Sequence, residues 1–341
     1  MARISQSDAI ILRTDSPESF RAAVLRATEL LRAGHVVAVP TETVYGLAAN
    51  AFDAQAVNRI FKIKGRPAHN PIIVHVSSVS MAKRCVSSWP LLAGKLARAF
   101  WPGPLTLVLP RSNSIPEIVT AGGPTVGVRW PSHPFMHSLI RECGFPLAAP
   151  SANLSNRVSP TNAEHVRKAL GNKISLIIDG GQAQVGIEST VLDLSVSPPQ
   201  VLRPGMIRGS TLRAATGRLG VEEQRGQMPK SPGMLRQHYA PRARLVIWFW
   251  HTEEELRQRS AAFGVNPRSV HVIAHDRIPS GQGFGRVSVI PHDAEAFARS
   301  IYAELHQCDE SGAELIIIEQ LPQTDEWKAI TDRLNRAAAA G

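Results

Sequence analysis

The sequence contains few cysteines, few aromatic residues and no long hydrophobic run. Its 3 cysteines, Cys85, Cys143 and Cys308, stand singly, so neither a disulfide framework nor a zinc site is expected, and a reducing cytoplasm is the expected compartment. The 12 histidines form no metal-ligand spacing. The longest clear apolar run, Leu245–Trp250, is far below the ~20 residues of a membrane helix, and the N-terminus lacks the apolar core of a secretion signal. We therefore expect no membrane association and no secretion.

The remaining composition is that of a globular chain. Apolar residues make up 43% and charged residues 19% of the 341 positions, which excludes a disordered protein. At about 150 residues per domain, this length predicts two domains.

Positive charge is concentrated in the first two-thirds of the chain. Residues 242–341 contain 11 Lys+Arg and 14 Asp+Glu, a net charge of −3. Because the whole chain has a net charge of +10, residues 1–241 have a net charge of +13. A basic domain can bind nucleic acid, but it can equally bind a small polyanion such as a nucleotide. Charge alone does not choose between these partners.

Residues 1–220 predict an α/β domain with a mixed, twisted, open sheet. Ser16 is a typical N-cap and Pro17 a typical first helical residue, and apolar residues then recur at helical spacing up to Gly34. Further helices are predicted near residues 54–62, 91–100, 134–142 and 161–170. Strands are predicted at residues 36–39, 71–76, 105–109, 125–129, 147–149, 176–179 and 189–194. Helices and strands interleave without the regular alternation of a doubly wound fold.

The rest of the chain predicts a linker and a second domain. Residues 221–241 are poor in apolar residues and include Pro229, Pro232 and Pro241, which is typical of a linker. Residues 242–341 then alternate regularly, with strands predicted at 244–250, 270–274, 287–290 and 314–318 and helices at 252–262, 292–307 and 325–338. This alternation predicts a smaller, Rossmann-like domain with a parallel sheet.

Two glycine-rich segments resemble nucleotide-binding loops but lack their essential residues. Gly181–Gly186 has P-loop glycine spacing, yet Ile187 and Glu188 stand where that loop needs Lys and Ser or Thr. Gly281–Gly285 lacks the third glycine of a dinucleotide loop and precedes a predicted strand. The first is predicted to be a turn before a strand and the second a loop.

Polar clusters follow several of the predicted strands in the basic domain. Arginine and lysine near hydroxyl groups at strand ends suit a phosphate chain, although each cluster alone is also compatible with a surface loop or a helix cap. The ordered segments are PTETVYGL (40–47), KGRP with NP and VH (64–75), WPGPLT (101–106), TVGVR (125–129), APSAN (149–153), GIEST (186–190) and RPG (203–205).

Taken in order, these segments resemble the threonylcarbamoyl-adenylate synthases, the YrdC-domain enzymes. SPGM (231–234) and HYAP (238–241) resemble the linker of the two-domain form, so the resemblance extends from about residue 20 to 241. It implies three parts: a YrdC-like catalytic domain at 1–220, a linker or lid at 221–241, and an accessory domain at 242–341. Between SPGM and HYAP this chain has Leu235-Arg236-Gln237 instead of the usual basic and aromatic residues.

The resemblance implies a nucleotidyltransferase reaction. Such enzymes convert L-threonine, bicarbonate or CO₂, and ATP into threonylcarbamoyl-AMP and pyrophosphate, for the modification of an adenosine in tRNA. The implied partners are these substrates and a downstream tRNA threonylcarbamoyl transferase, with weak binding of tRNA or double-stranded RNA as a further expectation. Mg²⁺ is expected to enter with the ATP phosphates, without a metal site of the protein's own.

The resemblance also implies roles for individual residues. Lys64 and Arg66 would be catalytic. The residues implied to surround ATP are Lys64, Arg66, Asn70, Thr125, Ser151, Asn153, Ser159, Arg203 and Tyr239, the last as part of a lid. The residues implied to hold L-threonine are Thr43, His75, Arg129, Ala149 and Ser189, with Thr41 as an alternative contact. No residue stands out as a general base.

Two other functions compete with this one. An RNA-binding module would use the basic domain without chemistry, but stacking aromatics are sparse at 6%. A carbamoyl transferase of hydrogenase maturation shares the same type of domain, but it would require zinc-finger cysteines near that domain.

Overall fold

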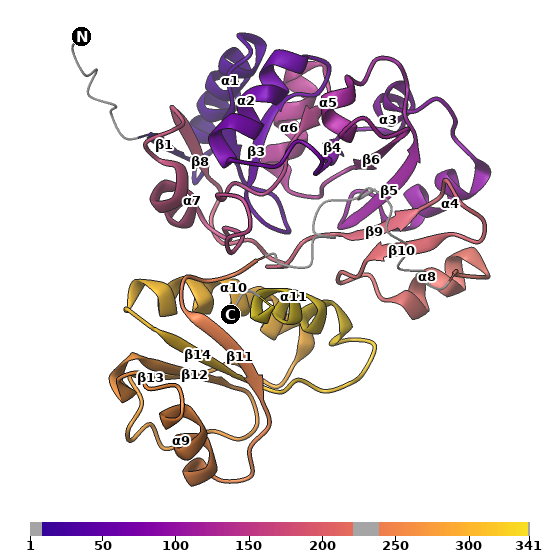
Figure 1. Ribbon diagram of the computed structural model, residues 1–341. Helices are drawn as coiled ribbons and strands as arrows, with labels where there is room; N and C mark the ends of the chain where they lie inside the picture. Colours follow the sequence, from indigo (N-terminus) through magenta and orange to yellow (C-terminus); the bar gives the residue numbers. More distant parts are fainter. Residues whose placement is uncertain (1–8, 221–238, 340–341) are drawn as a thin grey trace. The chain divides into compact units, whose positions relative to one another are not determined.

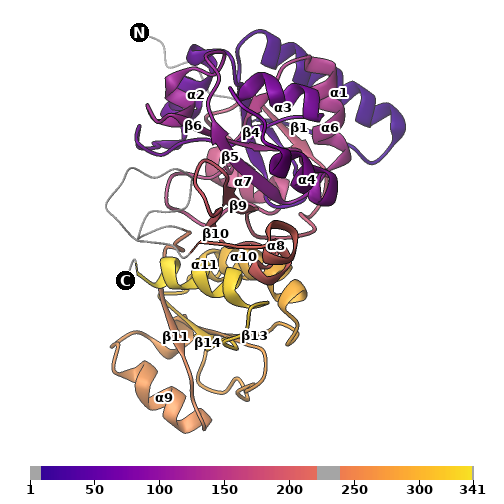
Figure 2. The same ribbon diagram turned by 90° about the vertical axis from the view of Figure 1, so that its right-hand side faces the viewer.

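In the computed structural model, which describes residues 9–220 and 239–339, the chain forms two sheets, each with its own core. The first unit comprises Met1–Ser155, Ser159–Gln184 and Glu188–Met234, and the second comprises Asn156–Val158, Val185–Ile187 and Leu235–Gly341 (Figure 1, Figure 2). Most of the predicted linker, including SPGM and Leu235-Arg236-Gln237, lies outside the described residues.

The first helix forms for the reasons visible in its sequence. Ser16 caps α1 (Pro17–Arg32): its side chain accepts from the Ser19 backbone N–H, and the Ser19 side chain accepts from that of Ser16. Pro17 occupies the first turn, where its missing N–H has no partner to lose. This confirms the predicted helix and its cap.

A mixed sheet of 10 strands forms the framework of the first unit. Its strands lie in the order β1-β8-β2-β3-β7-β4-β6-β5-β9-β10. Their bounds are β1 (Ile10–Arg13), β2 (Val37–Val39), β3 (Gly46–Asn50), β4 (Val74–His75), β5 (Leu105–Pro110), β6 (Thr125–Arg129), β7 (Leu147–Ala148), β8 (Leu176–Asp179), β9 (Thr190–Asp193) and β10 (Gln200–Arg203). The sheet contains both parallel pairs, such as β4–β6, and antiparallel pairs, such as β5–β6, which confirms the predicted mixed sheet.

Helices cover the two faces of this sheet unequally. The helices after α1 are α2 (Ala54–Lys64), α3 (Val79–Cys85), α4 (Leu91–Phe100), α5 (Glu117–Thr120), α6 (Pro134–Cys143), α7 (Ala163–Leu170) and α8 (Gly209–Thr216). The apolar sides of α1 and α6 form one core cluster with β2, β3 and β8. A larger cluster on the other face draws buried residues from α2, α3, α4, α5, α7 and α8. Both helices of the smaller cluster thus pack near one end of the strand order.

Several predicted bounds differ from the structure. The predicted strand 71–76 is reduced to β4, because the Ile72 N–H donates to Val119 O instead of to a neighbouring strand. The helix predicted from residue 161 begins at Ala163, because Asn162 provides the cap by accepting from the His165 backbone N–H. The polar segment 40–47 continues into the strand β3, which was not predicted and which pairs antiparallel with β2.

The second unit has a parallel sheet of 4 strands in the order β11-β14-β12-β13. Its elements are β11 (Arg244–Trp248), α9 (Glu253–Ala261), the 3-10 helix η1 (Pro267–Ser269), β12 (Val270–Ala274), β13 (Arg286–Val289), α10 (Ala294–Glu310), β14 (Leu315–Glu319) and α11 (Lys328–Ala338). Helix α9 lies on one face, while α10 and α11 lie on the other (Figure 1, Figure 2). This confirms the predicted parallel α/β domain, although β11 ends two residues earlier than expected and α11 begins three residues later.

Among the described residues, none of the helices has the length and apolar character needed to cross a bilayer.

Candidate functional site

The polar residues singled out in the sequence gather on one face of the first sheet because strand side chains alternate. Leu107, Val128 and Val74 are register partners on β5, β6 and β4, and all three face the large core cluster. Their neighbours along each strand therefore point to the opposite face. We call this opposite surface the site face and define it by Ile73, His75, Thr106, Val108, Gly127, Arg129 and Val191.

Beside the site face lies a narrow hollow that is too tight to hold a water molecule. Its lining is Pro71, Ile72, Ile73, Thr106, Val108, Val119, Thr120, Thr125, Val126, Gly127 and Val191. The packing at Gly127 is close, since a Cβ there would stand 3.1 Å from Thr106 Cγ2 and 3.5 Å from Ile73 Cγ1. The walls of the hollow are apolar with a few hydroxyl groups.

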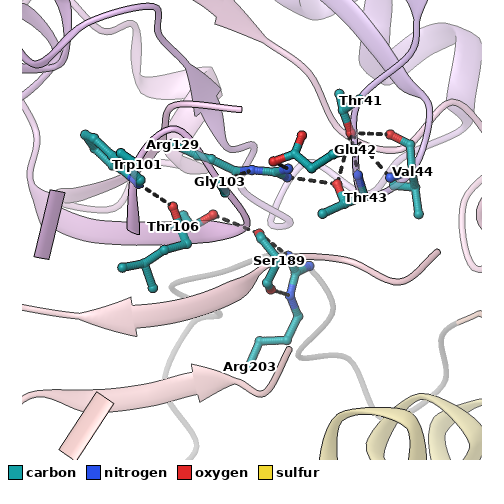
Figure 3. Close-up of polar contacts among 11 residues, drawn as sticks. Thr41, Glu42, Thr43, Val44, Trp101, Gly103, Thr106, Arg129, Ser189 and Arg203 are labelled. Carbon is teal, nitrogen blue, oxygen red and sulfur yellow. Dashed lines mark hydrogen bonds and ion pairs between the residues drawn. The ribbon is translucent and has the colours of Figure 1, made fainter. Parts of the chain in front are cut away.

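Arg129 lies beside the hollow at the end of β6 and is held by three groups (Figure 3). Its Nε donates to Gly103 O at 3.2 Å, and its Nη1 donates to Thr43 Oγ1 at 2.9 Å. Nη2 lies 2.7 Å from Glu42 Oε1, and both of these side chains are 4% exposed. Thr41 Oγ1 lies 3.0 Å from Thr43 Oγ1. The segment after β2 thus contacts one buried guanidinium through the Thr43 hydroxyl and the Glu42 carboxylate, and Thr41 contacts that hydroxyl.

Burial and the charge of Arg129 determine the protonation of its neighbours. Burial alone would raise the pKa of Glu42, but the adjacent guanidinium outweighs it, so the pKa is lowered and the ion pair is charged. Burial, and then the charge of Arg129, lower the pKa of His75 to about 3. His75 is therefore a neutral imidazole at pH 7.

A second network on the site face joins β5, β9 and β10 (Figure 3). Ser189 Oγ lies 2.9 Å from Thr106 Oγ1 and accepts from Arg203 Nη2 at 3.1 Å. Arg203 Nε donates to Ser189 O at 3.1 Å. The Thr190 N–H donates to Pro104 O at 3.0 Å, next to the Gly103 carbonyl that holds Arg129. The segment at 103–106 therefore links the two networks.

Lys64, the last residue of α2, is 2% exposed and holds the APSAN turn (149–153). Its Nζ donates to Ser151 O at 2.6 Å, to Asn153 O, and to Asn153 Oδ1 at 3.2 Å. The three hydrogens of an ammonium thus all find acceptors. Burial, and then the charge of Arg66, hold the pKa of Lys64 well below its usual value. Ser151 Oγ also donates to Asn153 Oδ1 at 2.6 Å.

Arg66 follows Gly65, which ends α2 at φ 60° and turns the chain inward. Arg66 Nε donates to Asn70 O at 3.0 Å, and its Nη2 donates to Asn70 Oδ1 at 2.7 Å. Lys64 and Arg66 of the KGRP segment, which alone would be typical of a solvated loop, are thus buried in the interior.

Ser159 lies elsewhere in the first unit. Its Oγ donates to Glu188 Oε1 at 2.6 Å, and both residues are buried.

Backbone hydrogen bonds bring the expected threonine and phosphate residues close together. Ala152 N donates to Tyr45 O at 2.8 Å, which joins the APSAN turn to the PTETVYGL segment. Ala149 N donates to Ile73 O at 3.2 Å, which joins the same turn to β4. His75 is the register partner of Arg129. The expected contacts Thr43, His75, Arg129 and Ala149 therefore share one region, with Lys64 bonded to the same turn.

Tyr239 is placed differently, because it belongs to the second unit. It has φ 63°, is 1% exposed and stacks on Tyr302 with ring centroids 5.9 Å apart. Arg333 Cζ lies 5.4 Å from the Tyr239 ring centroid. The expected contact between Tyr239 and ATP stays a prediction.

In the second unit, a side chain of the protein itself occupies the carboxyl end of the parallel sheet, where such sheets commonly bind anions. Glu319, at the carboxyl end of β14, accepts three successive backbone N–H groups, those of His275 at 2.8 Å, Asp276 at 2.9 Å and Arg277 at 3.0 Å. Such a row of N–H groups can hold a phosphate, but here a side-chain carboxylate occupies it.

Sequence reasoning missed three residues of these networks: Glu42, Thr106 and Glu188. Glu42 stands between two threonines directly after a buried strand, which was an available signal for a site carboxylate. Thr106 interrupts an otherwise apolar strand, and Glu188 lies inside the GIEST segment. Within 9–220 and 239–339, no three His, Cys, Asp or Glu side chains gather so as to hold a metal ion.

Comparisons with known proteins cover nearly the whole chain. A family model described as "Telomere recombination", for Sua5, YciO and YrdC proteins, matches residues 29–205. A second, described as "Threonylcarbamoyl-AMP synthase, C-terminal domain", matches residues 202–339.

Individual relatives show the same extent of similarity. The threonylcarbamoyl-AMP synthase of Bacillus subtilis is 40% identical over 96% of this chain and 94% of its own. That of Pyrococcus abyssi is 38% identical over 92% of this chain and 93% of its own. A crystal structure of the P. abyssi Sua5 protein complexed with L-threonine matches with a TM-score of 0.86 and 37% identity, covering 97% of this chain and 98% of that one.

The lowered pKa of His75 predicts that its ring stays neutral across the physiological range. NMR of ring-labelled histidine should show a signal, assigned by its loss in His75→Gln, that does not titrate between pH 8 and 5. An unfolded histidine would take up a proton below about pH 6.5, so burying His75 makes the folded state less stable as pH falls from there toward 3. A His75 midpoint near 6.5 would contradict the assigned environment.

Proposed function

The chain belongs to the threonylcarbamoyl-AMP synthase family, and on that premise we propose that it condenses L-threonine, bicarbonate or CO₂, and ATP into threonylcarbamoyl-AMP and pyrophosphate. The product would serve the modification of an adenosine in tRNA. The observation that carries the proposal is the buried cluster of Arg129, Thr43 and Ser189 contacts beside the apolar hollow, in a chain whose relative was crystallised with L-threonine.

Arg129 is the natural partner of the threonine carboxylate. A guanidinium has five N–H groups, and the protein contacts of Arg129 occupy at most three of them. The remaining two are available for a carboxylate, which arginine binds in a fork geometry. We assign Thr43, His75, Ser189 and the Ala149 backbone to the rest of the amino acid, with His75 acting as a neutral hydrogen-bonding group.

ATP is assigned to the hollow and the cations around it. Its base would lie against the apolar wall near Thr125. The polar residues assigned to its sugar and phosphates are Lys64, Arg66, Asn70, Ser151, Asn153, Ser159 and Arg203. Lys64 would act chiefly by holding the APSAN turn, since its three contacts are all to that turn. Tyr239 is assigned to the nucleotide as part of a lid.

The proposed chemistry requires positive charge more than a strong base. The amine of threonine forms a carbamate with the one-carbon substrate, and a carbamate oxygen then attacks the α-phosphorus while pyrophosphate leaves. Two anions meet in that second step, so cations and oriented N–H groups lower its barrier. Holding the reactants in line contributes as well.

Mg²⁺ is proposed to enter with ATP, bound to its phosphates, where it would neutralise their charge. The described residues offer no cluster of three or more acidic, histidine or cysteine ligands, so the donor set fits a metal carried by the nucleotide. We further propose cytoplasmic action and transfer of the product to a tRNA threonylcarbamoyl transferase, with weak RNA binding to the basic first unit.

The direct test is pyrophosphate release by the purified chain. With ATP, L-threonine and bicarbonate present, release should depend on all three, and mass spectrometry should detect threonylcarbamoyl-AMP. Pyrophosphate formed equally fast without threonine would exclude the proposed reaction.

Removing Lys64 should abolish most turnover because the APSAN turn loses the cation that holds three of its oxygens. We expect Lys64→Ala to lower kcat/KM by about 10²–10³-fold, in the range found for removing one pre-organised donor. Lys62→Ala, at an exposed position on the same helix, is the matched control and should retain activity. Equal activity in both variants would refute the role of Lys64.

Filling the hollow should affect the nucleotide and spare the amino acid. We expect Gly127→Ala to raise the KM for ATP modestly and Gly127→Val to raise it about 10-fold or more, because the added atoms would press on Thr106 and Ile73 in the wall assigned to the base. The KM for L-threonine should change little in either variant. A larger effect on threonine than on ATP would contradict this placement.

A further inference from the structure

Residues 203–207, which begin at the last residue of β10, close around the peptide that joins Ser189 to Thr190, and we call them the collar. At its start, Arg203 donates from Nε to Ser189 O and from Nη2 to Ser189 Oγ, each at 3.1 Å (Figure 3). Two residues later, Gly205 packs directly on the peptide. A Cβ at Gly205 would stand 2.3 Å from Thr190 N and 2.8 Å from Ser189 C, so no side chain fits there.

The side chain of Thr190 fastens the far end of the collar. Thr190 Oγ1 donates to Ile207 O at 3.0 Å and accepts from Ile207 N at 3.2 Å, and the residue is fully buried. On its other side, Thr190 N donates to Pro104 O at 3.0 Å. The Ser189–Thr190 peptide is therefore held between the segment before β5 and the collar after β10.

Holding this peptide fixes the direction in which the Ser189 hydroxyl can bind a further group. A hydroxyl makes up to three hydrogen bonds, one as donor and two as acceptor. Two of those of Ser189 are made with Thr106 Oγ1 at 2.9 Å and with Arg203 Nη2 at 3.1 Å. The third points where these two leave room, so its direction depends on where the collar holds the backbone of Ser189.

We propose that Thr190 and Gly205 are positioning residues for the reaction. They keep the collar against the peptide of Ser189 and thereby aim the third hydrogen bond of its hydroxyl at L-threonine. The inference rests on the proposed function for the assignment of Ser189 to L-threonine, and it gives a role to two residues that this function leaves without one. Such residues matter because a displacement of about 1 Å in a binding group can lower a rate about 100-fold.

The hydroxyl of Thr190 can be removed with little change of shape. In Thr190→Val, Ile207 loses both bonds to that hydroxyl and the collar is released. We expect the KM for L-threonine in pyrophosphate release to rise about 10-fold, the effect of one lost buried hydrogen bond. The KM for ATP should change less, because the residues assigned to ATP come from several other segments. Thr190→Ser retains the hydroxyl and should rescue the KM for L-threonine to within about 2-fold of the unaltered value.

A second threonine of the first unit is the matched control for Thr190. Thr216, at the end of α8, donates from Oγ1 to Leu212 O at 2.9 Å. Thr216→Val removes a comparable hydroxyl and should retain the unaltered KM for L-threonine. An equal rise of this KM in Thr216→Val and Thr190→Val would show that general destabilisation is responsible and would overturn the inference.

Gly205 allows an independent test from the other end of the collar. Gly205→Ala places a methyl group against Thr190 N, so the collar must move away and the KM for L-threonine should again rise about 10-fold. Gly94→Ala is the control, because a Cβ there stands 3.6 Å from Trp89 Nε1, an ordinary contact distance. Equal values of this KM in Gly205→Ala and Gly94→Ala would contradict the role of Gly205.

The unaltered protein provides a test that needs no variant. Coupling between two sites is reciprocal, so if the collar positions Ser189 for L-threonine, bound L-threonine must also stabilise the collar. Hydrogen exchange of the Ile207 N–H should therefore slow by about 5-fold or more at saturating L-threonine. The Gly217 N–H, which donates to Arg213 O at 2.8 Å in α8, should slow less. This result decides the matter even where Thr190→Val or Gly205→Ala does not fold, since unchanged exchange at Ile207 overturns the inference.

The outcomes distinguish this inference from the proposed function. An unaltered KM for L-threonine in Thr190→Val and Gly205→Ala, with threonine-dependent pyrophosphate release intact, overturns the positioning roles and leaves the proposed function standing. Absence of L-threonine binding and of threonine-dependent pyrophosphate release in the unaltered protein overturns the proposed function and the inference together.

Discussion

The buried contact between Arg129 and Glu42 is the interaction on which the site depends. Arg129 is the last residue of β6. Its guanidinium contacts Glu42 and Thr43, which follow β2, and the carbonyl of Gly103, which precedes β5. One guanidinium thus fixes three separate parts of the chain. Losing either charge would leave the other buried without compensation, which typically costs about 3–5 kcal/mol. The geometry of the site is therefore inseparable from the folding of the first unit.

The sheet explains why this pair is available for chemistry. Strand alternation sends Leu107 and Val128 to the large core and sends Thr106 and Arg129 to the opposite face. On that opposite face, helices α1 and α6 pack over β2, β3 and β8. Farther along the sheet, the small apolar cluster of Ile73, Val108, Val191 and Leu202 contains no residue from a helix. Hydroxyls, cations and an apolar hollow can then lie side by side. In the second unit, the Glu319 carboxylate accepts three successive backbone N–H groups at the end of β14.

Features with local causes were predictable from the sequence. The cap by Ser16, the start at Pro17 and the strand at 125–129 depend on neighbouring residues, and the structure confirms them. Contacts between distant residues were not predictable in the same way. Glu42 meets Arg129 far along the chain, and nothing near either residue announces the pairing. The KGRP segment by itself is typical of a solvated loop, yet the carbonyls of Ser151 and Asn153 enclose Lys64.

The family resemblance supplied what local patterns could not. It singled out Thr43, His75 and Arg129 together, and hydrogen bonds and strand register place them in one region. It did not single out Glu42 or Thr106, because their roles become visible only through their partners in space. The Tyr239 ring stacks on Tyr302 within the second unit, and the contact between Tyr239 and the nucleotide stays a prediction.

A crystal structure of the chain with L-threonine and a non-hydrolysable ATP analogue tests the account most directly. It predicts the amino-acid carboxylate on Arg129 and the base against the wall that contains Gly127 and Thr125. An amino acid bound away from Arg129, or a nucleotide whose base lies away from Thr125, would contradict it.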